Sequence, residues 1–383
     1  MSVTAARGFL ASGVAAGLKE SGDPDLALVV NQGPSRAAAG VFTSNRVQAA
    51  PVRWSRRVLA DGRISAVVLN SGGANACTGQ AGAVDALLMA EHTARAVEAD
   101  PHEVAVCSTG LIGVRLPMDR VDAGITDAAA RLSPRGGEDA AVAIKTTDSV
   151  HKTAVVTASG WTVGGMAKGA GMLAPGLATM LAVLTTDADV DAGLLDSTLR
   201  AAARTTFDRV DSDGCMSTND TVLLLASGAS GVVPETEAFA EAVRSVCLDL
   251  ARQLVADAEG ASKEIEVRVV GAAREEDAVE VGRSIARNNL LKCALHGEDP
   301  NWGRVLSAIG TTAAEFDPDR LDVTINGVRV CRSGAADEPR DKVDLSGRRI
   351  TVTADLRTGD ASAVIWTNDL TAEYVHENSA YSS

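Results

Sequence analysis

The stretch KGAGMLAPGLATMLAVLT, from Lys168 to Thr185, contains the junction on which the interpretation of this chain depends. A turn rich in glycine and proline (168–178) runs directly into the apolar segment 179–185, which predicts a buried strand beginning at Thr179. If the peptide bond between Ala178 and Thr179 were cut, the Thr179 hydroxyl would lie beside a free α-amine. That amine can accept the hydroxyl proton, so no histidine would be needed. We therefore hypothesise that Thr179 is a nucleophile released by self-cleavage.

A simpler interpretation of the same junction is that Thr179 is an ordinary strand residue. Threonine favours strands, and glycine and proline commonly mark strand boundaries. Taken alone, the local pattern favours this simpler interpretation, so the nucleophile hypothesis needs support from the rest of the chain.

The composition is that of a globular protein with a large core and few aromatic residues. Of the 383 residues, 46% are hydrophobic and 3% are aromatic, which predicts a core built from Ala, Val and Leu. The net charge of −14 argues against sequence-independent nucleic-acid binding and against adhesion to an anionic membrane. The N-terminal residues make a poor signal peptide, and no window reaches the length of a membrane-spanning helix.

The six cysteines are far apart in the sequence and form no C-x-x-C pair. This spacing argues against a disulfide framework and against a zinc site. We expect reduced, mostly buried thiols in a cytoplasmic protein.

Apolar segments with strand and helix character alternate along the chain, with no internal repeat and no low-complexity linker. This alternation predicts compact, layered sheets and helices. The expected strands are 25–31, 64–70, 104–107, 154–157, 161–164, 221–225 and 264–270, the expected helices are 80–99, 117–132, 191–208, 235–259 and 275–295, and the tail from 322 onward is mostly strands.

Three turns rich in small residues follow strands, at 70–79, 108–113 and 168–171. Such turns bring backbone N–H groups close to a ligand and can stabilise an oxyanion, although each taken alone is better explained as a tight turn. The spacing of Gly169, Gly171 and Ala174 resembles a dinucleotide fingerprint, but Pro175 follows where the phosphate-binding helix should continue. Near the end of the helix expected at 235–259, Glu259 has two interpretations, an i,i+4 pair with Lys263 or a ligand for a substrate amine.

Several longer motifs resemble those of one enzyme family, the ornithine acetyltransferases, also called bifunctional glutamate N-acetyltransferases of arginine biosynthesis. The resemblance runs essentially end to end and lifts the Thr179 hypothesis to an expectation. The motifs are GVAAGLK (13–19), NSGGANACTG (70–79), STGLIG (108–113), GGMAKGAGM (164–172), ATML (178–181), STNDTV (217–222), GEDPNWGR (297–304) and YVHENSAYSS (374–383).

The resemblance implies an α/β fold, an αββα sandwich similar to but topologically distinct from N-terminal-nucleophile hydrolases, with a smaller C-terminal α/β portion. It implies self-cleavage at Ala178-Thr179 into an α chain (1–178) and a β chain (179–383), which assemble as a heterotetramer of two α and two β chains. The implied reaction moves the acetyl group of N2-acetylornithine to glutamate in the cytoplasm, without a metal or other cofactor. The sequence leaves open whether acetyl-CoA also serves as a donor.

The resemblance also implies roles for individual residues. Thr179 is the nucleophile, and Thr109 and Gly110 form the oxyanion hole. The implied substrate contacts are Thr146, Lys168, Thr179, Glu259, Asn378 and Ser383. We further hypothesise that Lys168 pairs with the substrate α-carboxylate and that Glu259 binds the δ-ammonium group of ornithine.

Two alternatives from other classes stay open at this point. One is a self-processing amidohydrolase with the same nucleophile, in which water takes up the acyl group. The other is a metabolite-binding protein without catalytic activity, in which the chain stays uncut.

Overall fold

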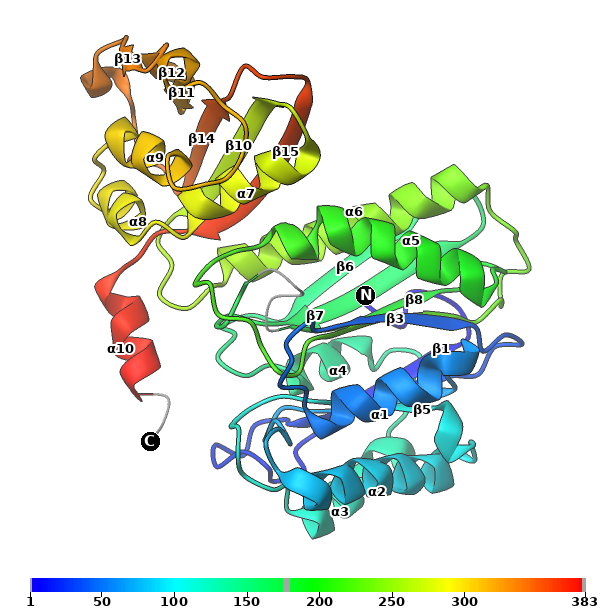
Figure 1. The fold of residues 1–383 in the computed structure, drawn as a ribbon. Helices are drawn as coiled ribbons and strands as arrows, with labels where there is room; N and C mark the ends of the chain where they lie inside the picture. Colours follow the sequence, from blue (N-terminus) through cyan, green and yellow to red (C-terminus); the bar gives the residue numbers. More distant parts are fainter. Residues whose placement is uncertain (1, 175–179, 381–383) are drawn as a thin grey trace. The chain divides into compact units, whose positions relative to one another are not determined.

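The computed structural model describes residues 2–174 and 180–380 and divides the chain into two compact units (Figure 1). The first unit comprises Met1–Asp208 and Cys215–Leu254. The second comprises Arg209–Gly214 and Val255–Ser383.

The first unit contains a four-stranded sheet with the order β1-β2-β4-β5. Its strands are β1 (Phe9–Val14), β2 (Leu26–Asn31), β4 (Ala66–Asn70) and β5 (Val104–Ser108). β4 and β5 are parallel neighbours, so the polar turns that follow them lie at the same end of the two strands. Two helices, α2 (Gly79–Val97) and α3 (Met118–Ala130), cover one face of this sheet (Figure 1).

Both edges of this sheet are covered. On the β5 side, α1 (Ala50–Val58) supplies Ser55, whose hydroxyl accepts the Val106 N–H at 2.8 Å and donates to the Val106 carbonyl at 2.7 Å. On the β1 side, Ser133 pairs with Ala11 through two backbone hydrogen bonds of 3.0 Å, just before α4 (Gly137–Ala143). Buried edge groups left without partners would cost about 1–3 kcal/mol each, so these contacts stabilise the ends of the sheet.

The second sheet of this unit has five strands in the order β3-β9-β8-β7-β6. Its strands are β3 (Ala38–Phe42), β6 (Lys152–Thr157), β7 (Thr162–Lys168), β8 (Leu181–Thr186) and β9 (Thr221–Ala226). Every residue of β8 and β9 is buried, as expected for parallel strands covered on both faces. Helices α5 (Ala192–Thr205) and α6 (Thr236–Ala256) cover its outer face, and one hydrophobic core joins its inner face to the four-stranded sheet (Figure 1).

The second unit is an α/β structure with its own core. Its six-stranded sheet has the order β13-β12-β11-β14-β10-β15. α7 (Glu275–Ala286) packs on β10 (Glu264–Ala272) and β15 (Ala361–Asn368). The other elements that complete this unit are α8 (Asn289–His296), α9 (Trp302–Ile309), β11 (Asp322–Ile325), β12 (Val328–Arg332), β13 (Ala335–Ala336), β14 (Arg349–Asp355) and α10 (Ala372–Ala380).

The predicted fold class is confirmed. In the first unit, helices cover the outer faces of two stacked sheets, and the second unit is the smaller C-terminal α/β portion. The core of the first unit is built mostly from Ala, Val and Leu, as the composition predicts, whereas the core of the second unit contains Ile as well as these three. In the part of the chain that the structure describes, no helix is both long enough and apolar enough to cross a bilayer.

Two expectations from the sequence are wrong. The single helix expected at 275–295 is two helices, because the chain breaks after α7 and the Asn288 side chain accepts the Leu291 N–H at 2.9 Å to start α8. The cysteines are not mostly buried, since Cys77, Cys215 and Cys293 are exposed while the other three are buried. Cys77 and Cys215 lie in loops, and Cys293 lies on an outer face of α8, so none of the three contributes to a core.

Candidate active site

Two of the small-residue turns meet at the carboxyl ends of β4 and β5. The Thr109 N–H donates to the Asn70 carbonyl at 3.0 Å, and the Gly73 N–H donates to the Thr109 carbonyl at 2.9 Å. The Asn70 side chain donates to the Ser108 hydroxyl at 2.6 Å. These bonds fix Thr109, which is buried, against the turn that follows β4.

Gly110 holds a conformation that favours glycine. Its φ is +130°, and a Cβ atom there would lie 2.7 Å from the Gly73 nitrogen and 2.9 Å from the Gly73 Cα atom. Among the described residues, none accepts a hydrogen bond from the Gly110 N–H. The amide is therefore available to an oxygen atom of a ligand.

Lys168 brings a positive charge to the same place from the other sheet. It is the last residue of β7, pairs in register with Leu181 of β8, and is 2% exposed. Its Nζ atom donates to the Thr109 Oγ1 atom at 3.3 Å. Because this bond uses a lone pair of the hydroxyl oxygen, the hydroxyl hydrogen of Thr109 can be donated elsewhere.

A buried carboxylate organises the surroundings of Lys168. The Asp148 Oδ1 atom accepts hydrogen bonds of 2.6 Å from Lys152 Nζ and from the Gly169 N–H, and Oδ2 accepts the Thr146 N–H at 2.9 Å. Burial raises the pKa of Asp148, but the charges of Lys168 and Lys152 and the Gly169 N–H outweigh this and lower the pKa to about 2. Asp148 therefore ties Thr146, which is half-buried, to the turn after β7.

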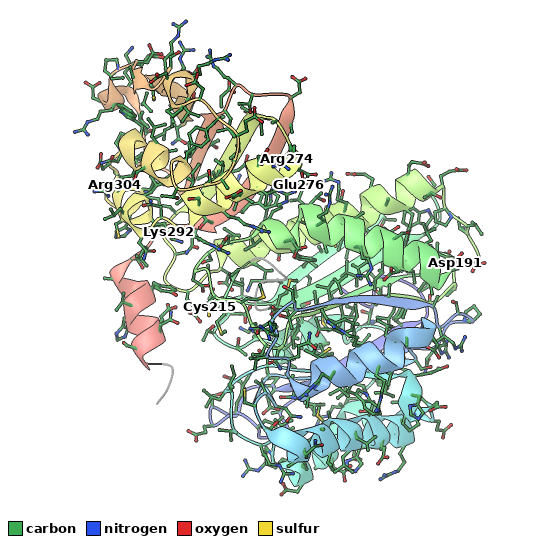
Figure 2. All side chains as sticks on the ribbon, in the orientation of Figure 1. Asp191, Cys215, Arg274, Glu276, Lys292 and Arg304 are labelled. Atoms are coloured by element: carbon green, nitrogen blue, oxygen red, sulfur yellow. The ribbon has the colours of Figure 1, made fainter. Side chains whose placement is uncertain are left out.

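Asp148 and Lys152 were not among the residues predicted from the sequence. The available signal is the scarcity of lysine, since the chain has only seven lysines among its 36 basic residues. Four of them, Lys152, Lys168, Lys263 and Lys292, are buried, and Lys292 is labelled in Figure 2. Because most basic residues of this chain are arginines, each lysine is a candidate member of a buried polar cluster.

The second unit brings together two other predicted substrate contacts. The Asn378 Nδ2 atom, in α10, donates to the Glu259 Oε2 atom at 2.9 Å. The alternative i,i+4 partner of Glu259 is engaged elsewhere, since Lys263 Nζ donates to the Leu345 carbonyl at 2.7 Å and to Glu298 at 3.3 Å. Of the two interpretations of Glu259, the structure thus gives no support to the pair with Lys263.

The remaining predicted residues, Ala178, Thr179 and Ser383, lie outside the described residues. Met180, which follows Thr179 in the chain, is described and buried, and its N–H donates to the Asp220 Oδ1 atom at 3.1 Å. Within residues 2–174 and 180–380, no three side chains of His, Cys, Asp or Glu are grouped as metal ligands.

Comparison with known proteins gives the family. A family model described as the ArgJ family matches residues 10–383. A protein of Streptomyces avermitilis named arginine biosynthesis bifunctional protein ArgJ is 72% identical over 383 residues, which are 100% of both chains.

Two solved structures are also similar. One, an arginine biosynthesis bifunctional protein ArgJ from Bacillus halodurans, is 34% identical with a TM-score of 0.50 and covers 51% of this chain and 97% of that one. The other, an ornithine acetyltransferase complexed with ornithine from Mycobacterium tuberculosis, is 56% identical with a TM-score of 0.45 and covers 47% of this chain and 96% of that one. By its family model and its full-length relative, this chain belongs to the ArgJ family.

Proposed function

We propose that this chain cleaves itself between Ala178 and Thr179 and then transfers the acetyl group of N2-acetylornithine to glutamate. The products are ornithine and N-acetylglutamate, two intermediates of arginine biosynthesis. Thr179 is the nucleophile in both the cleavage and the transfer.

The observation that carries this proposal is the position of Lys168. It faces Leu181 across the β7–β8 pair, two residues after Thr179 in the chain, and its Nζ atom lies 3.3 Å from the Thr109 hydroxyl. The end of β7, the start of β8 and the turn after β5 therefore meet in one place. A cation, two oxyanion donors and the start of the nucleophile strand are the parts that an acyl transfer needs.

The transfer proceeds in two steps with a covalent intermediate. The Thr179 oxygen attacks the acetyl carbonyl, its proton passes to the Thr179 α-amine, and the amide C–N bond breaks as the ornithine nitrogen takes up a proton. The amine of glutamate then attacks the acetyl-threonine ester and releases the Thr179 hydroxyl. In both steps the Thr109 hydroxyl and the Gly110 N–H donate hydrogen bonds to the tetrahedral oxygen.

Self-cleavage consumes one water molecule and leaves a carboxylate on Ala178 and the amine on Thr179. The two products stay together because they share one sheet. Strands β3, β6 and β7 come from residues 1–178, whereas β8 and β9 come from 179–383, and β7 pairs with β8 over six residues. A division of the chain into two pieces also agrees with the length of the Bacillus halodurans chain, since 97% of that chain corresponds to 51% of this one.

The charges at the site suit amino-acid substrates. Lys168 is a buried cation beside the proposed oxyanion donor Thr109. A substrate α-carboxylate bound at Lys168 would form a charge-assisted hydrogen bond. Glu259, held by Asn378, is the acceptor that we assign to the δ-ammonium group of ornithine. Thr146 and Ser383 complete the proposed substrate contacts.

Intact mass spectrometry tests the proposal in one measurement. The wild-type protein should appear as chains 1–178 and 179–383, and incubation with N2-acetylornithine should add an acetyl group to the second chain. Thr179→Ala should stay a single chain, while Thr186→Ala, which removes a buried hydroxyl at the far end of the same strand, should be cleaved. A fully active wild-type protein that remains one unbroken chain would refute the proposal.

The same preparation separates the remaining possibilities. Release of acetate from N2-acetylornithine without glutamate would favour the amidohydrolase, and formation of N-acetylglutamate from acetyl-CoA would add a second donor. We expect a cytoplasmic heterotetramer of two α and two β chains, which size-exclusion chromatography with light scattering can test.

A further inference from the structure

The segment Ser217–Asp220 leads into strand β9, and the mechanism proposed above assigns it no role. All four of its side chains are polar and all four residues are buried. Its backbone is held in place by the Thr43 hydroxyl, which donates to the Ser217 carbonyl at 2.7 Å, and by the Ser217 hydroxyl, which accepts the Asn219 N–H at 3.1 Å. A run of buried polar side chains is unfavourable unless each one has a partner, so their partners show what the segment does.

Asp220 binds the residue that follows Thr179. Its Oδ1 atom accepts the Met180 N–H at 3.1 Å, while the Met180 carbonyl accepts the N–H of Thr221 at 3.1 Å. Both backbone polar groups of Met180 are therefore fixed by two adjacent residues. Met180 is joined by one peptide bond to Thr179, the proposed nucleophile.

Asn219 binds the residue that precedes Thr109. Its Nδ2 atom donates to the Ser108 carbonyl at 2.8 Å and to the Ala74 carbonyl at 2.6 Å. The Ser108 carbonyl belongs to the peptide bond with Thr109, the first of the two proposed oxyanion donors. Two neighbouring side chains of this segment thus bind the backbone at Met180, which follows Thr179, and at Ser108, which precedes Thr109.

We propose that Asp220 and Asn219 are positioning residues that together set the distance between Thr179 and the Thr109–Gly110 oxyanion hole. This inference rests on the proposed function and adds residues that the resemblance does not supply. A displacement of the reacting groups by about 1 Å can lower the rate roughly 100-fold, so hydrogen bonds that fix these two backbone segments affect catalysis.

The buried surroundings of Asp220 suit a positioning role that does not depend on a negative charge. Burial raises the pKa of this carboxyl well above its ordinary value, although the Met180 N–H opposes the shift. Burial thus favours the uncharged form of the carboxyl, and an amide of the same shape can replace it. Asp220→Asn keeps an oxygen acceptor for the Met180 N–H, whereas Asp220→Ala removes it.

The experiment compares these two variants with the wild type in the full chain. Asp220→Ala should slow self-cleavage by about tenfold or more and lower the kcat of acetyl transfer by a similar factor, with the KM for N2-acetylornithine within about twofold. Asp220→Asn should restore both rates to within a few-fold of the wild type. The matched control is Asp25→Ala, which removes a buried carboxylate that accepts the N–H groups of Ala16 and Leu18. This control should lower stability without a selective loss of cleavage.

Three outcomes would overturn the inference. Asp220→Ala could cleave and react like the wild type, Asp220→Asn could be as slow as Asp220→Ala, or Asp25→Ala could be equally impaired. If Asp220→Ala is insoluble, Asn219→Ala tests the contact with the Ser108 carbonyl instead. This variant should lower kcat with KM unchanged. A wild-type kcat in Asn219→Ala would also overturn the inference. A wild-type protein that is not cleaved would instead refute the proposed function, so the two failures are distinguishable.

Discussion

The Nζ atom of Lys168 lies 3.3 Å from the Oγ1 atom of Thr109, although the two residues come from different sheets of the first unit. Lys168 ends β7 of the five-stranded sheet, and Thr109 follows β5 of the four-stranded sheet. The contact therefore joins the two layers of the sandwich at one point. It also puts a cation beside a proposed oxyanion donor, where it can act on both substrate binding and the developing negative charge.

Replacing Lys168 with Met should weaken substrate binding and slow the reaction. The loss of a charge-assisted hydrogen bond to the α-carboxylate, about 1.5–3 kcal/mol, predicts a rise of roughly 10-fold to 100-fold in the KM for N2-acetylornithine. Steady-state kinetics with varied N2-acetylornithine measures this change. The control is Lys152→Met, which removes the lysine hydrogen-bonded to Asp148 and should change KM less. An unchanged KM in Lys168→Met would contradict the role assigned to this lysine.

Replacing Gly110 with Ala should reduce acetyl transfer by about 100-fold or more, the cost of losing one oxyanion-hole donor. The added Cβ atom would lie 2.7 Å from the Gly73 nitrogen, so the backbone must shift and carry the Gly110 N–H away from the tetrahedral oxygen. Gly113→Ala is the matched control, because its φ of +88° imposes a comparable left-handed strain with nothing within 4 Å of the Cβ atom. We expect the control to keep most of its kcat, and equal losses in the two variants would argue for strain alone.

The parts of the site that follow regular strands could be predicted from the sequence. Thr109 and Lys168 stand where apolar runs end in small-residue turns, and the parallel pairing of β4 with β5 brings two of those turns together. The residues that escaped prediction, Asp148 and Asn219, lie in irregular segments. Asp148 binds Lys152 four residues on, but the Gly169 N–H that it also accepts is 21 positions away, and the Ser108 carbonyl bound by Asn219 is 111 positions away. Local spacing does not reveal these two distant contacts.

The boundaries of elements show the same limit. Apolar residues keep a helical spacing through 275–295, which predicts one helix, yet the chain turns between α7 and α8. The signal for this break is the helix-capping residue Asn288, and a cap in the middle of an apolar pattern is easily overlooked. The apolar pattern of the core therefore predicts the fold class, whereas helix caps and long-range polar contacts determine where helices end and which side chains meet in the site.

Replacing Glu259 with Gln should raise the KM for N2-acetylornithine by about tenfold, because a neutral amide loses the attraction to the δ-ammonium group. The KM for glutamate, which has no ammonium group in its side chain, should change by less than about twofold. Initial rates with each substrate varied in turn give both constants. Glu373→Gln, on the same helix as Asn378 but exposed, should leave both constants unchanged. Equal increases in the two constants would argue against this assignment of Glu259.

The cluster around Asp148 should make stability depend on pH in the acidic range. In the folded protein the pKa of Asp148 is lowered from 3.8 to about 2, so its carboxylate stabilises the fold above pH 4 and loses that effect as the pH falls toward 2. The shift corresponds to about 2 kcal/mol near neutral pH, of which about 1 kcal/mol should be lost by pH 3. Calorimetric unfolding of the wild type and of Asp148→Asn between pH 6 and pH 3 measures this loss. The asparagine variant should be less stable throughout, because it leaves two buried lysines without their carboxylate, and the gap to the wild type should narrow as the pH falls. A gap that stays constant over this range would mean that Asp148 does not titrate as its surroundings require.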